Sequence, residues 1–260
     1  MDELAFALEL AEAADEVSMK YFTRDPEASL KKDGSLVTVA DKEIEALIRR
    51  RIREQFPAHA ILGEETGLEG DAGAPIWIID PIDGTNNYAS GIPVFGTLVA
   101  LRVGGRTEVG VASAPALGER YDAAIGDGAR MNGKPIQVSK VDVMADAVIC
   151  IGSYRRMRKR GYQEQLDRIF DDCRRDRGFG DFWGYMLVAK GAAEVMLEPN
   201  LNVWDVAALE VIVGEAGGRA SNFAGDPYPE SRITDYFSGD GSFIATNGVL
   251  HEELVARLAT

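Results

Sequence analysis

The chain has 260 residues, of which 46% are hydrophobic and 27% charged, a globular balance that excludes a disordered or fibrous protein. Its formal net charge of −14 argues against nucleic acid as a partner, because phosphate backbones are bound by basic faces. No apolar run is long enough to span a bilayer, and the N-terminus is acidic and amphipathic, so we expect a cytoplasmic protein without a membrane partner. Cys150 and Cys173 lack metal-type spacing and are interpreted as reduced residues.

The first half of the chain is predicted to contain two helices followed by meandering strands. Apolar residues recur at helical spacing near the N-terminus, and alternating or continuous apolar runs between glycine turns follow them. The helices are expected at 3–22 and 41–55, and the strands at 77–79, 95–103, 108–115 and 119–125. The strand at 77–79 is expected to stop at Asp80-Pro81, because proline cannot continue a sheet ladder.

In the second half, strands and helices alternate. Strands are expected at 147–151, 194–197 and 242–245, and helices at 161–175, 182–191, 205–216 and 248–258. The helix at 205–216 ends at Gly217-Gly218, where glycine suits the left-handed C-terminal cap. Meandering strands followed by alternating elements favour an α+β fold of stacked layers over one doubly wound sheet.

The strongest chemical signal lies at the end of the apolar strand Trp77–Ile79. Asp80 follows this strand directly, and Asp83 comes three residues later. Two carboxylates so close would repel each other strongly unless a cation lay between them, and Mg²⁺ prefers such oxygen ligands. Gly84 permits tight backbone geometry, so the amides of Gly84 and Thr85 can hold a phosphate oxygen. The alternative is an acidic surface turn with a helix cap, which the apolar strand disfavours.

Two other segments also carry acids at the end of an apolar run or at the start of an expected helix. Glu64 and Glu65 follow an apolar run and a glycine, and one of them could bridge metals or polarise the attacking water. Alone, that segment is more often a strand followed by a solvated loop. Asp205 lies at the start of an apolar helix, where a helix N-cap is the simpler interpretation. A capping carboxylate can still present its other oxygen to a metal.

Together these segments resemble the inositol monophosphatase superfamily. The resemblance rests on Gly63-Glu64-Glu65, Asp80-Pro-Ile-Asp83-Gly84-Thr85 and Trp204-Asp205-Val-Ala-Ala208, in that order, and covers roughly residues 5–258. It implies a layered αβαβα sandwich, usually homodimeric, that hydrolyses a small-molecule phosphate ester. The cofactor would be Mg²⁺, roughly two or three ions per active site, with direct in-line attack by water.

The resemblance also implies roles for individual residues. The metal ligands would be Glu64, Asp80, the backbone carbonyl of Ile82, Asp83, Asp205 and, near a weaker third metal, Asp41. Glu64, Thr85 and Asp83 would be catalytic, with Glu64 and Thr85 orienting the water, and Gly84 and Thr85 would bind phosphate. Asp41 can equally be the acid of a helix start. Lys31 or Lys32 would lie over the site.

Three acids are expected to select the substrate. Asp181 follows a glycine after which inositol-type members commonly carry small or hydroxyl residues, and an extra carboxylate there favours a cationic alcohol. Glu198 and Asp205 match positions that contact the alcohol. The phrase Gly180-Asp181-Phe-Trp-Gly-Tyr185, with Glu198-Pro199 and Asn202-Val-Trp204-Asp205, resembles the histidinol-phosphate phosphatases of this superfamily. A helix N-cap is the alternative for Asp181.

The predicted activity is hydrolysis of L-histidinol phosphate, with an inositol-phosphate or broad sugar-phosphate monophosphatase as the alternative. A regulatory binding protein on the same fold is disfavoured, because such a binder has no need of the whole acidic set. We divide the chain into an N-terminal half, 1–145, with the metal-binding motifs and a C-terminal half, 146–260, with the substrate-recognition segment. The active site would lie between them. The cluster Arg155–Arg160 is interpreted as a solvated helix start.

Overall fold

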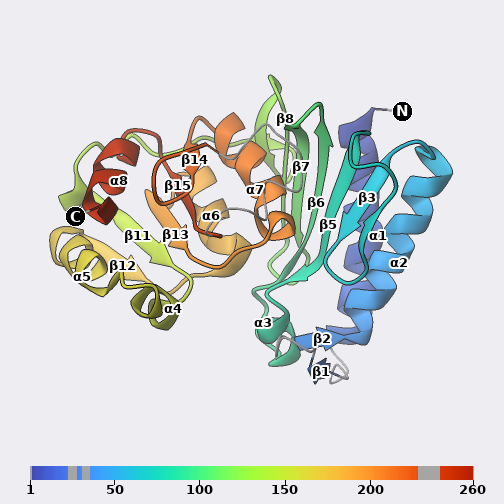
Figure 1. Ribbon diagram of the computed structural model, residues 1–260, viewed down its shortest axis with the longest axis horizontal. Coiled ribbons are helices and arrows are strands. Elements are labelled where there is room, and N and C mark those ends of the chain that lie inside the picture. The colour runs from blue at the N-terminus through green and yellow to red at the C-terminus, as the bar shows by residue number, and fades with distance from the viewer. Residues whose placement is uncertain (1, 23–27, 31–35, 228–240, 260) are drawn as a thin grey trace.

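Two β-sheets and three layers of helix make up the fold (Figure 1). The computed structural model describes residues 2–22, 28–30, 36–227 and 241–259. From one side to the other, the layers are a helix pair, an eight-stranded sheet, a second helix pair, a five-stranded sheet and an outer helix layer. The α+β sandwich of αβαβα type that the sequence predicts is confirmed.

The helices are distributed over the three helical layers. The first layer holds α1 (Glu3–Phe22) and α2 (Val39–Gln55). The central layer holds α6 (Asp181–Ala189) and α7 (Val203–Glu215). The outer layer and the connections hold α3 (Thr85–Ala89), α4 (Tyr154–Lys159), α5 (Gln163–Asp172), α8 (His251–Ala259) and the short 3₁₀ helix η1 (Met144–Asp146).

The larger sheet is mostly antiparallel, and only β3 and β5 pair in parallel. Its strands, in spatial order, are β10 (Lys134–Pro135), β9 (Gly128–Met131), β8 (Glu119–Ala124), β7 (Arg106–Ala114), β6 (Gly96–Val103), β5 (Ile76–Asp83), β3 (Ala60–Gly63) and β4 (Gly67–Glu69). A separate hairpin-like pair joins β1 (Ala28–Leu30) to β2 (Leu36–Thr38).

The smaller sheet mixes parallel and antiparallel pairs. Its strands, in spatial order, are β12 (Arg175–Arg177), β11 (Val148–Ile151), β13 (Val195–Glu198), β15 (Phe243–Thr246) and β14 (Arg219–Ser221). Strand β11 runs parallel to β12 and β13, whereas β15 is antiparallel to both of its neighbours. Among the residues that the structure describes, no helix is long and apolar enough to cross a membrane.

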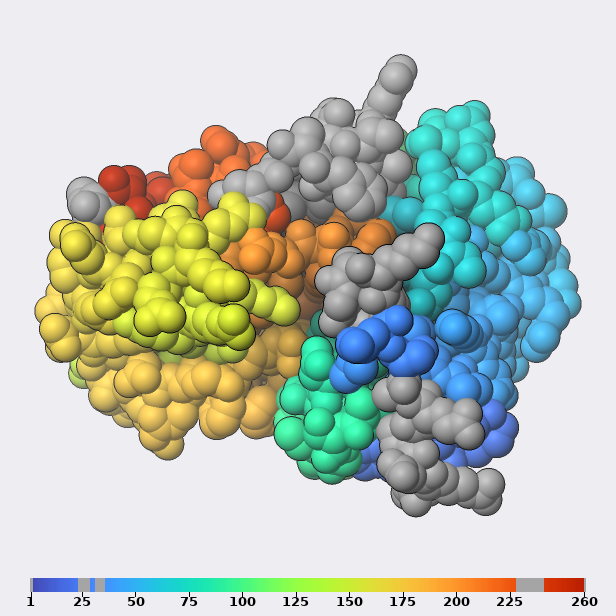
Figure 2. Space-filling view, turned by 60° about the horizontal axis from the view of Figure 1, so that its bottom comes forward, coloured from blue at the N-terminus to red at the C-terminus, as the bar shows by residue number. Residues whose placement is uncertain are grey.

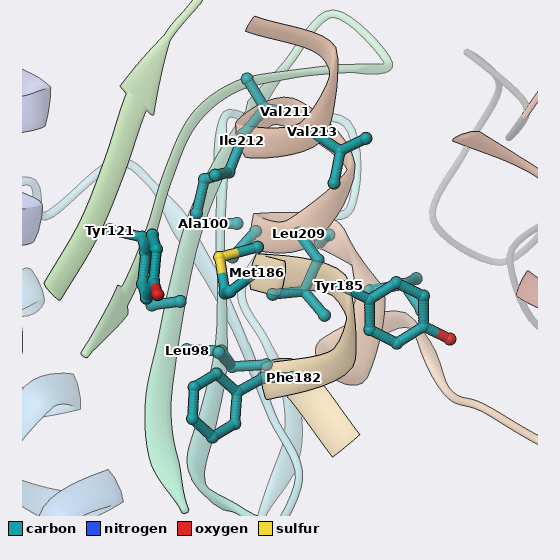
Figure 3. Close-up of a cluster of buried hydrophobic side chains, with 14 of the residues drawn as sticks. Leu98, Ala100, Tyr121, Phe182, Tyr185, Met186, Leu209, Val211, Ile212 and Val213 are labelled. Atoms are coloured by element: carbon teal, nitrogen blue, oxygen red, sulfur yellow. The ribbon is translucent and has the colours of Figure 1, made fainter. Parts of the chain in front are cut away.

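Alternation along the strands assigns each side chain to one of three cores. In β5, Trp77 and Ile79 face α1 and α2, whereas Ile78 faces the central helices. Figure 3 shows how Phe182 and Met186 of α6 pack on that central face of the sheet. Burying a large apolar side chain contributes about 1.5–3 kcal/mol, so these layers fix the strand ends that carry the polar residues.

Most predicted elements differ from the structure only by small shifts of their bounds, and two differ more clearly. Strand β5 does not stop at Asp80-Pro81 but continues to Asp83, with an irregular register between Asp80 and Asp83. Proline removes one ladder donor, while the carbonyl of Pro81 accepts a hydrogen bond from the hydroxyl of Thr97 at 2.8 Å. The strand therefore bends through the acidic segment rather than ending before it.

The predicted helix at 161–175 is shorter, because α5 covers only Gln163–Asp172 and β12 follows it. The Arg155–Arg160 cluster lies at an exposed helix start, as predicted, but this helix is a separate one. Most of it forms α4, which Ser153 caps, and Gly161, with a φ of 87°, separates α4 from α5. A left-handed residue at this point favours glycine and breaks the helix.

Candidate active site

A cavity of about 180 Å³ lies between the two large sheets, where ends of their strands meet ends of helices. The end of β5, the end of β13 and the starts of α3, α6 and α7 line it. Figure 2 shows this face, where the green residues of α3, the yellow residues of α4 and orange residues near the start of α7 come close together. Every predicted site residue except Asp41 lines this cavity.

Three carboxylates form the centre of the site. Oxygen atoms of Asp80, Asp83 and Asp205 lie within 4.8 Å of one another. Burial raises the pKa of Asp80 and of Asp83 well above the usual range, and neighbouring acids raise it further. Burial likewise raises the pKa of Asp205 to about 7. Among the described residues, the buried Oδ1 of Asp80 has no hydrogen-bond partner. Such a set fits a hard divalent cation, which would relieve the repulsion.

Asp205 is not the N-cap of α7. Asn202 is the capping residue, and its backbone N–H donates to Oδ2 of Asp205 at 2.7 Å, which completes a capping box. The helix therefore starts at Val203, two residues before the predicted start. Because a carboxylate has two oxygens, Asp205 can complete the helix start and still belong to the acidic cluster.

Asp41 occupies the same position in α2. Its Oδ2 accepts hydrogen bonds from the backbone N–H of Thr38 at 2.7 Å and from the Thr38 hydroxyl at 2.5 Å. The interpretation as a helix-start acid is therefore correct. Its buried Oδ1 has no hydrogen-bond partner within the described part of the chain, and burial raises the pKa of Asp41 to about 6. Asp41 lies behind the cavity wall rather than on it.

Glu64 lies beside the cluster at the end of β3. Its backbone N–H donates to the carbonyl of Ile79 at 3.2 Å, which extends the parallel pairing with β5 by one residue. The negative charge of Glu64 contributes to the raised pKa of Asp80, of Asp205 and of Asp41. Glu64 therefore lines the same cavity as Asp80, Asp83 and Asp205, but it is not one of the three acids whose oxygens lie within 4.8 Å of one another.

Gly84 and Thr85 shape the turn from β5 into α3. Gly84 has a φ of 80°, and a Cβ there would lie 3.0 Å from the carbonyl oxygen of Val94, so this position suits glycine. The Thr85 hydroxyl donates to the carbonyl of Ile82 at 2.9 Å. Its oxygen therefore remains available as an acceptor toward the cavity.

Asp181 belongs to the cavity wall that the start of α6 and the end of β13 form, and it is not the N-cap of α6. Gly180 takes the capping position, and Asp181 is the first helical residue, with a φ of 55°. Oδ2 of Asp181 accepts a hydrogen bond from the side-chain amide of Asn87 at 2.9 Å. The next residue, Phe182, donates its backbone N–H to Oδ2 of Asp83 at 2.5 Å. The start of α6 therefore links the acidic cluster to this wall.

Glu198 ends β13 on the same wall and is 4% exposed. Burial raises the pKa of Glu198 to about 8, and the charge of Asp181 adds to this effect. A Cβ on Gly152 would lie 2.1 Å from the carboxyl carbon of Glu198, so glycine leaves the space that this carboxylate fills. The guanidinium of Arg156 approaches Oε1 of Glu198 at 3.4 Å.

Three further residues of this wall were given no role by the sequence analysis. Arg156 belongs to a cluster interpreted as a solvated helix start, and only its place in the structure brings it to the cavity. Asn87 follows the Asp83-Gly84-Thr85 motif, and only the fold brings it to Asp181, 94 residues further along the chain. Gly152 carries no signal in the sequence. Lys31 and Lys32 lie outside the described residues.

The layered sandwich and its acidic cavity define the class of protein, a phosphatase of the α+β type that the sequence predicts. The chain belongs to the inositol monophosphatase family, whose model matches residues 1–260. A histidinol-phosphatase of Mycobacterium tuberculosis is 38% identical and one of Streptomyces coelicolor 40%; the alignments cover 99% of this chain and 98% and 97% of those proteins. A solved inositol monophosphatase (IMPase) of Thermotoga maritima superimposes with a TM-score of 0.87 at 32% identity, covering 100% of this chain and 97% of that one.

These relatives support a phosphomonoesterase activity and confirm the family resemblance that the three motifs indicated.

Proposed function

We propose that the protein hydrolyses L-histidinol phosphate to L-histidinol and phosphate, with Mg²⁺ as its cofactor. The observation that carries this proposal is the pair of enclosed carboxylates, Asp181 and Glu198, which line the same cavity in addition to the acidic cluster. A neutral polyol does not need two acids, whereas the ammonium group of histidinol does. The similarity to two histidinol-phosphatases supports the same substrate.

The acidic cluster would hold the cofactor. Glu64, Asp80, Asp83, Asp205 and the carbonyl of Ile82 would provide the oxygen ligands. When bound, Mg²⁺ would neutralise the phosphate, activate water and stabilise the leaving alkoxide. Whether Asp41 supports a further ion stays a prediction, as do the homodimer and the cytoplasmic location.

The chain's own groups would orient water and phosphate. The Thr85 hydroxyl donates its proton to the carbonyl of Ile82. The Thr85 oxygen would therefore accept a hydrogen bond from the attacking water. Glu64 would accept the second one, which leaves a lone pair of the water directed at phosphorus. The backbone N–H groups of Gly84 and Thr85, at the start of α3, would donate to the phosphate oxygens.

On their wall of the cavity, Asp181 and Glu198 would bind the ammonium group of the alcohol. The hydrogen bond from Asn87 keeps one oxygen of Asp181 in place and leaves the other for the substrate. A cation beside Glu198 would favour its charged form and so lower the pKa that burial raises.

The deciding experiment measures phosphate release with Mg²⁺ from L-histidinol phosphate and from myo-inositol 1-phosphate. We expect kcat/KM to favour histidinol phosphate by about 100-fold or more, or roughly 3 kcal/mol of transition-state discrimination. Comparable or reversed values would contradict the substrate and favour the alternative, an inositol-phosphate or broad sugar-phosphate monophosphatase, which the similarity to the Thermotoga maritima enzyme supports. No Mg²⁺-dependent turnover of either ester would favour a regulatory binding protein.

A further inference from the structure

We propose that Glu45, which lies outside the cavity, is a positioning residue that fixes the segment bearing Glu64. The inference rests on the role as a metal ligand that the proposed function gives to Glu64. Glu45 belongs to α2, and its side chain is 1% exposed. A buried carboxylate that does not line the cavity requires an explanation, because it is stable only when its hydrogen bonds are satisfied.

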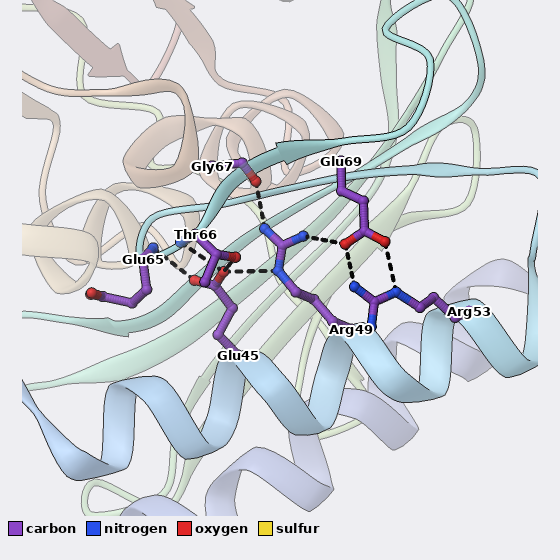
Figure 4. Close-up of polar contacts among 7 residues, drawn as sticks. All are labelled: Glu45, Arg49, Arg53, Glu65, Thr66, Gly67 and Glu69. Carbon is purple, nitrogen blue, oxygen red and sulfur yellow. Dashed lines mark hydrogen bonds and ion pairs between the residues drawn. The ribbon is translucent and has the colours of Figure 1, made fainter.

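The two oxygens of Glu45 bind the residues that follow Glu64 (Figure 4). Oε2 accepts the backbone N–H of Glu65 at 2.8 Å, and Oε1 accepts the backbone N–H of Thr66 at 3.1 Å. The hydroxyl of Thr66 also donates to Oε1. One side chain of α2 thus binds two successive amides of the turn that begins at Glu64.

On the other side of Glu64, Gly63 lies directly over the same carboxylate. A Cβ on Gly63 would be 2.4 Å from the carboxyl carbon of Glu45, so only a residue without a side chain allows this contact. Both chain neighbours of Glu64 therefore contact Glu45: Gly63 packs against its carboxylate, and Glu65 donates a hydrogen bond to it. Its backbone has little freedom to move relative to the acidic cluster.

A second charge orients Glu45 itself. Arg49 lies one turn further along α2 and donates its Nε to Oε1 of Glu45 at 2.9 Å. The same guanidinium binds the carbonyl of Gly67 and, at 3.2 Å, the carboxylate of Glu69 on β4. Arg49 thereby fastens the far end of the turn, and the β3–β4 connection is held to α2 at both ends.

A measurement of Mg²⁺ affinity distinguishes a positioning role of Glu45 from a contribution to folding stability alone. We expect Glu45→Gln to raise the dissociation constant for Mg²⁺, measured by titration calorimetry, by about 10–100-fold, because residues behind the ligands usually have effects of this size. The amide of glutamine has nearly the same volume but would turn a donor toward Arg49 or the two backbone N–H groups. The Mg²⁺ concentration for half-maximal activity should rise in parallel, with a smaller change in KM for the ester.

Glu43→Gln is the matched control. It removes the same charge from α2, but Glu43 contacts only Lys20 and Tyr21 among the interactions described, and its side chain is 41% exposed. Its Mg²⁺ affinity should equal that of the wild type. If Glu45→Gln binds Mg²⁺ as the wild type does, Glu45 is not a positioning residue.

Two further variants cover the remaining outcomes. Should Glu45→Gln not fold, Thr66→Val removes one hydrogen bond to Glu45 and should weaken Mg²⁺ binding severalfold in the same direction; unchanged affinity would overturn the inference. Glu64→Gln tests the underlying proposal, because a Mg²⁺ affinity unaffected by this change would refute Glu64 as a ligand. Weak binding in Glu64→Gln with normal binding in Glu45→Gln would refute the positioning role alone.

Discussion

The two walls of the cavity are built in different ways. On the side of the acidic cluster, strand β5, two helix-capping boxes and the buried Glu45 network hold the acids through backbone hydrogen bonds. On the other wall, Glu198 meets Arg156, whose side chain is 51% exposed and comes from the short surface helix α4. The difference indicates that backbone hydrogen bonds of the fold hold the acids proposed for the chemistry, whereas the wall proposed for substrate choice includes an exposed side chain of a short surface helix.

The largest effect should come from the fixed side. Asp83→Asn removes a carboxylate of the cluster with little change in side-chain volume. We expect kcat to fall on the order of 10³-fold, which corresponds to roughly 4 kcal/mol of activation free energy, while the fold is retained. Without Mg²⁺ the variant should melt at a higher temperature, since one source of repulsion is gone. Phosphate-release assays and thermal unfolding test this, with Asp176→Asn on the exposed strand β12 as the control. An active Asp83→Asn enzyme would refute the metal-site assignment.

The pH dependence of stability should separate the metal-free from the Mg²⁺-loaded protein. The folded-state pKa values of Asp205, about 7, and Glu198, about 8, lie above those of the unfolded chain. The folded state therefore retains protons that the unfolded state has released, and its stability falls as pH rises through these values. In EDTA, we expect a loss on the order of a few kcal/mol between about pH 5 and pH 9, measured by urea unfolding.

With Mg²⁺ this loss should be smaller, because the cation stabilises the deprotonated cluster and binding releases protons. The difference between the two pH series isolates the site from other titrating groups. Identical slopes in EDTA and Mg²⁺ would contradict a cation at this cluster.

A smaller effect is expected on the wall that carries Asp181 and Glu198. Asp181→Ala should raise KM for histidinol phosphate by about 10–100-fold, the usual effect of losing one partner of an enclosed charge pair. KM for inositol phosphate should change far less, because a hydroxyl does not depend on the charge. Steady-state kinetics on both esters test this, and equal changes would make Asp181 a structural residue.

The smallest effect concerns Arg156, which shares Glu198 with the expected ammonium group. Arg156→Gln should lower KM for histidinol phosphate by up to about fivefold, because an exposed ion pair contributes at most about 1 kcal/mol. Arg158→Gln removes the same charge from an exposed position of α4 and serves as the control. A higher KM for both esters in Arg156→Gln would mean that Arg156 attracts the phosphate instead.

The fixed wall was largely predictable from the sequence, because its signals are local. An apolar strand that leads into Asp80 and Asp83 identifies the cluster, and hydrophobic periodicity identifies the layers. The continuation of β5 through Pro81 was not predictable, since it depends on the neighbouring strand β6, where the hydroxyl of Thr97, sixteen residues away, donates to the carbonyl of Pro81.

The supports of the site were missed for the same reason. Glu45 and Arg49 have the i, i+4 spacing of a solvated ion pair, and their burial depends on β3 and β4 lying over them. Gly152 and Glu198 are 46 residues apart in sequence and meet only because β11 and β13 are parallel neighbours.

The position of Asp205 within a capping box has a dynamic consequence. Helix α7 fills the central layer and contacts strands of both sheets. A cation held by Asp205 would therefore reinforce the first turn of the helix that joins the two halves of the molecule, and local opening of that turn would require its release. Amide hydrogen exchange in the first turn of α7 should accordingly slow when Mg²⁺ is added. The exchange rate of these amides would then report whether the cofactor is bound.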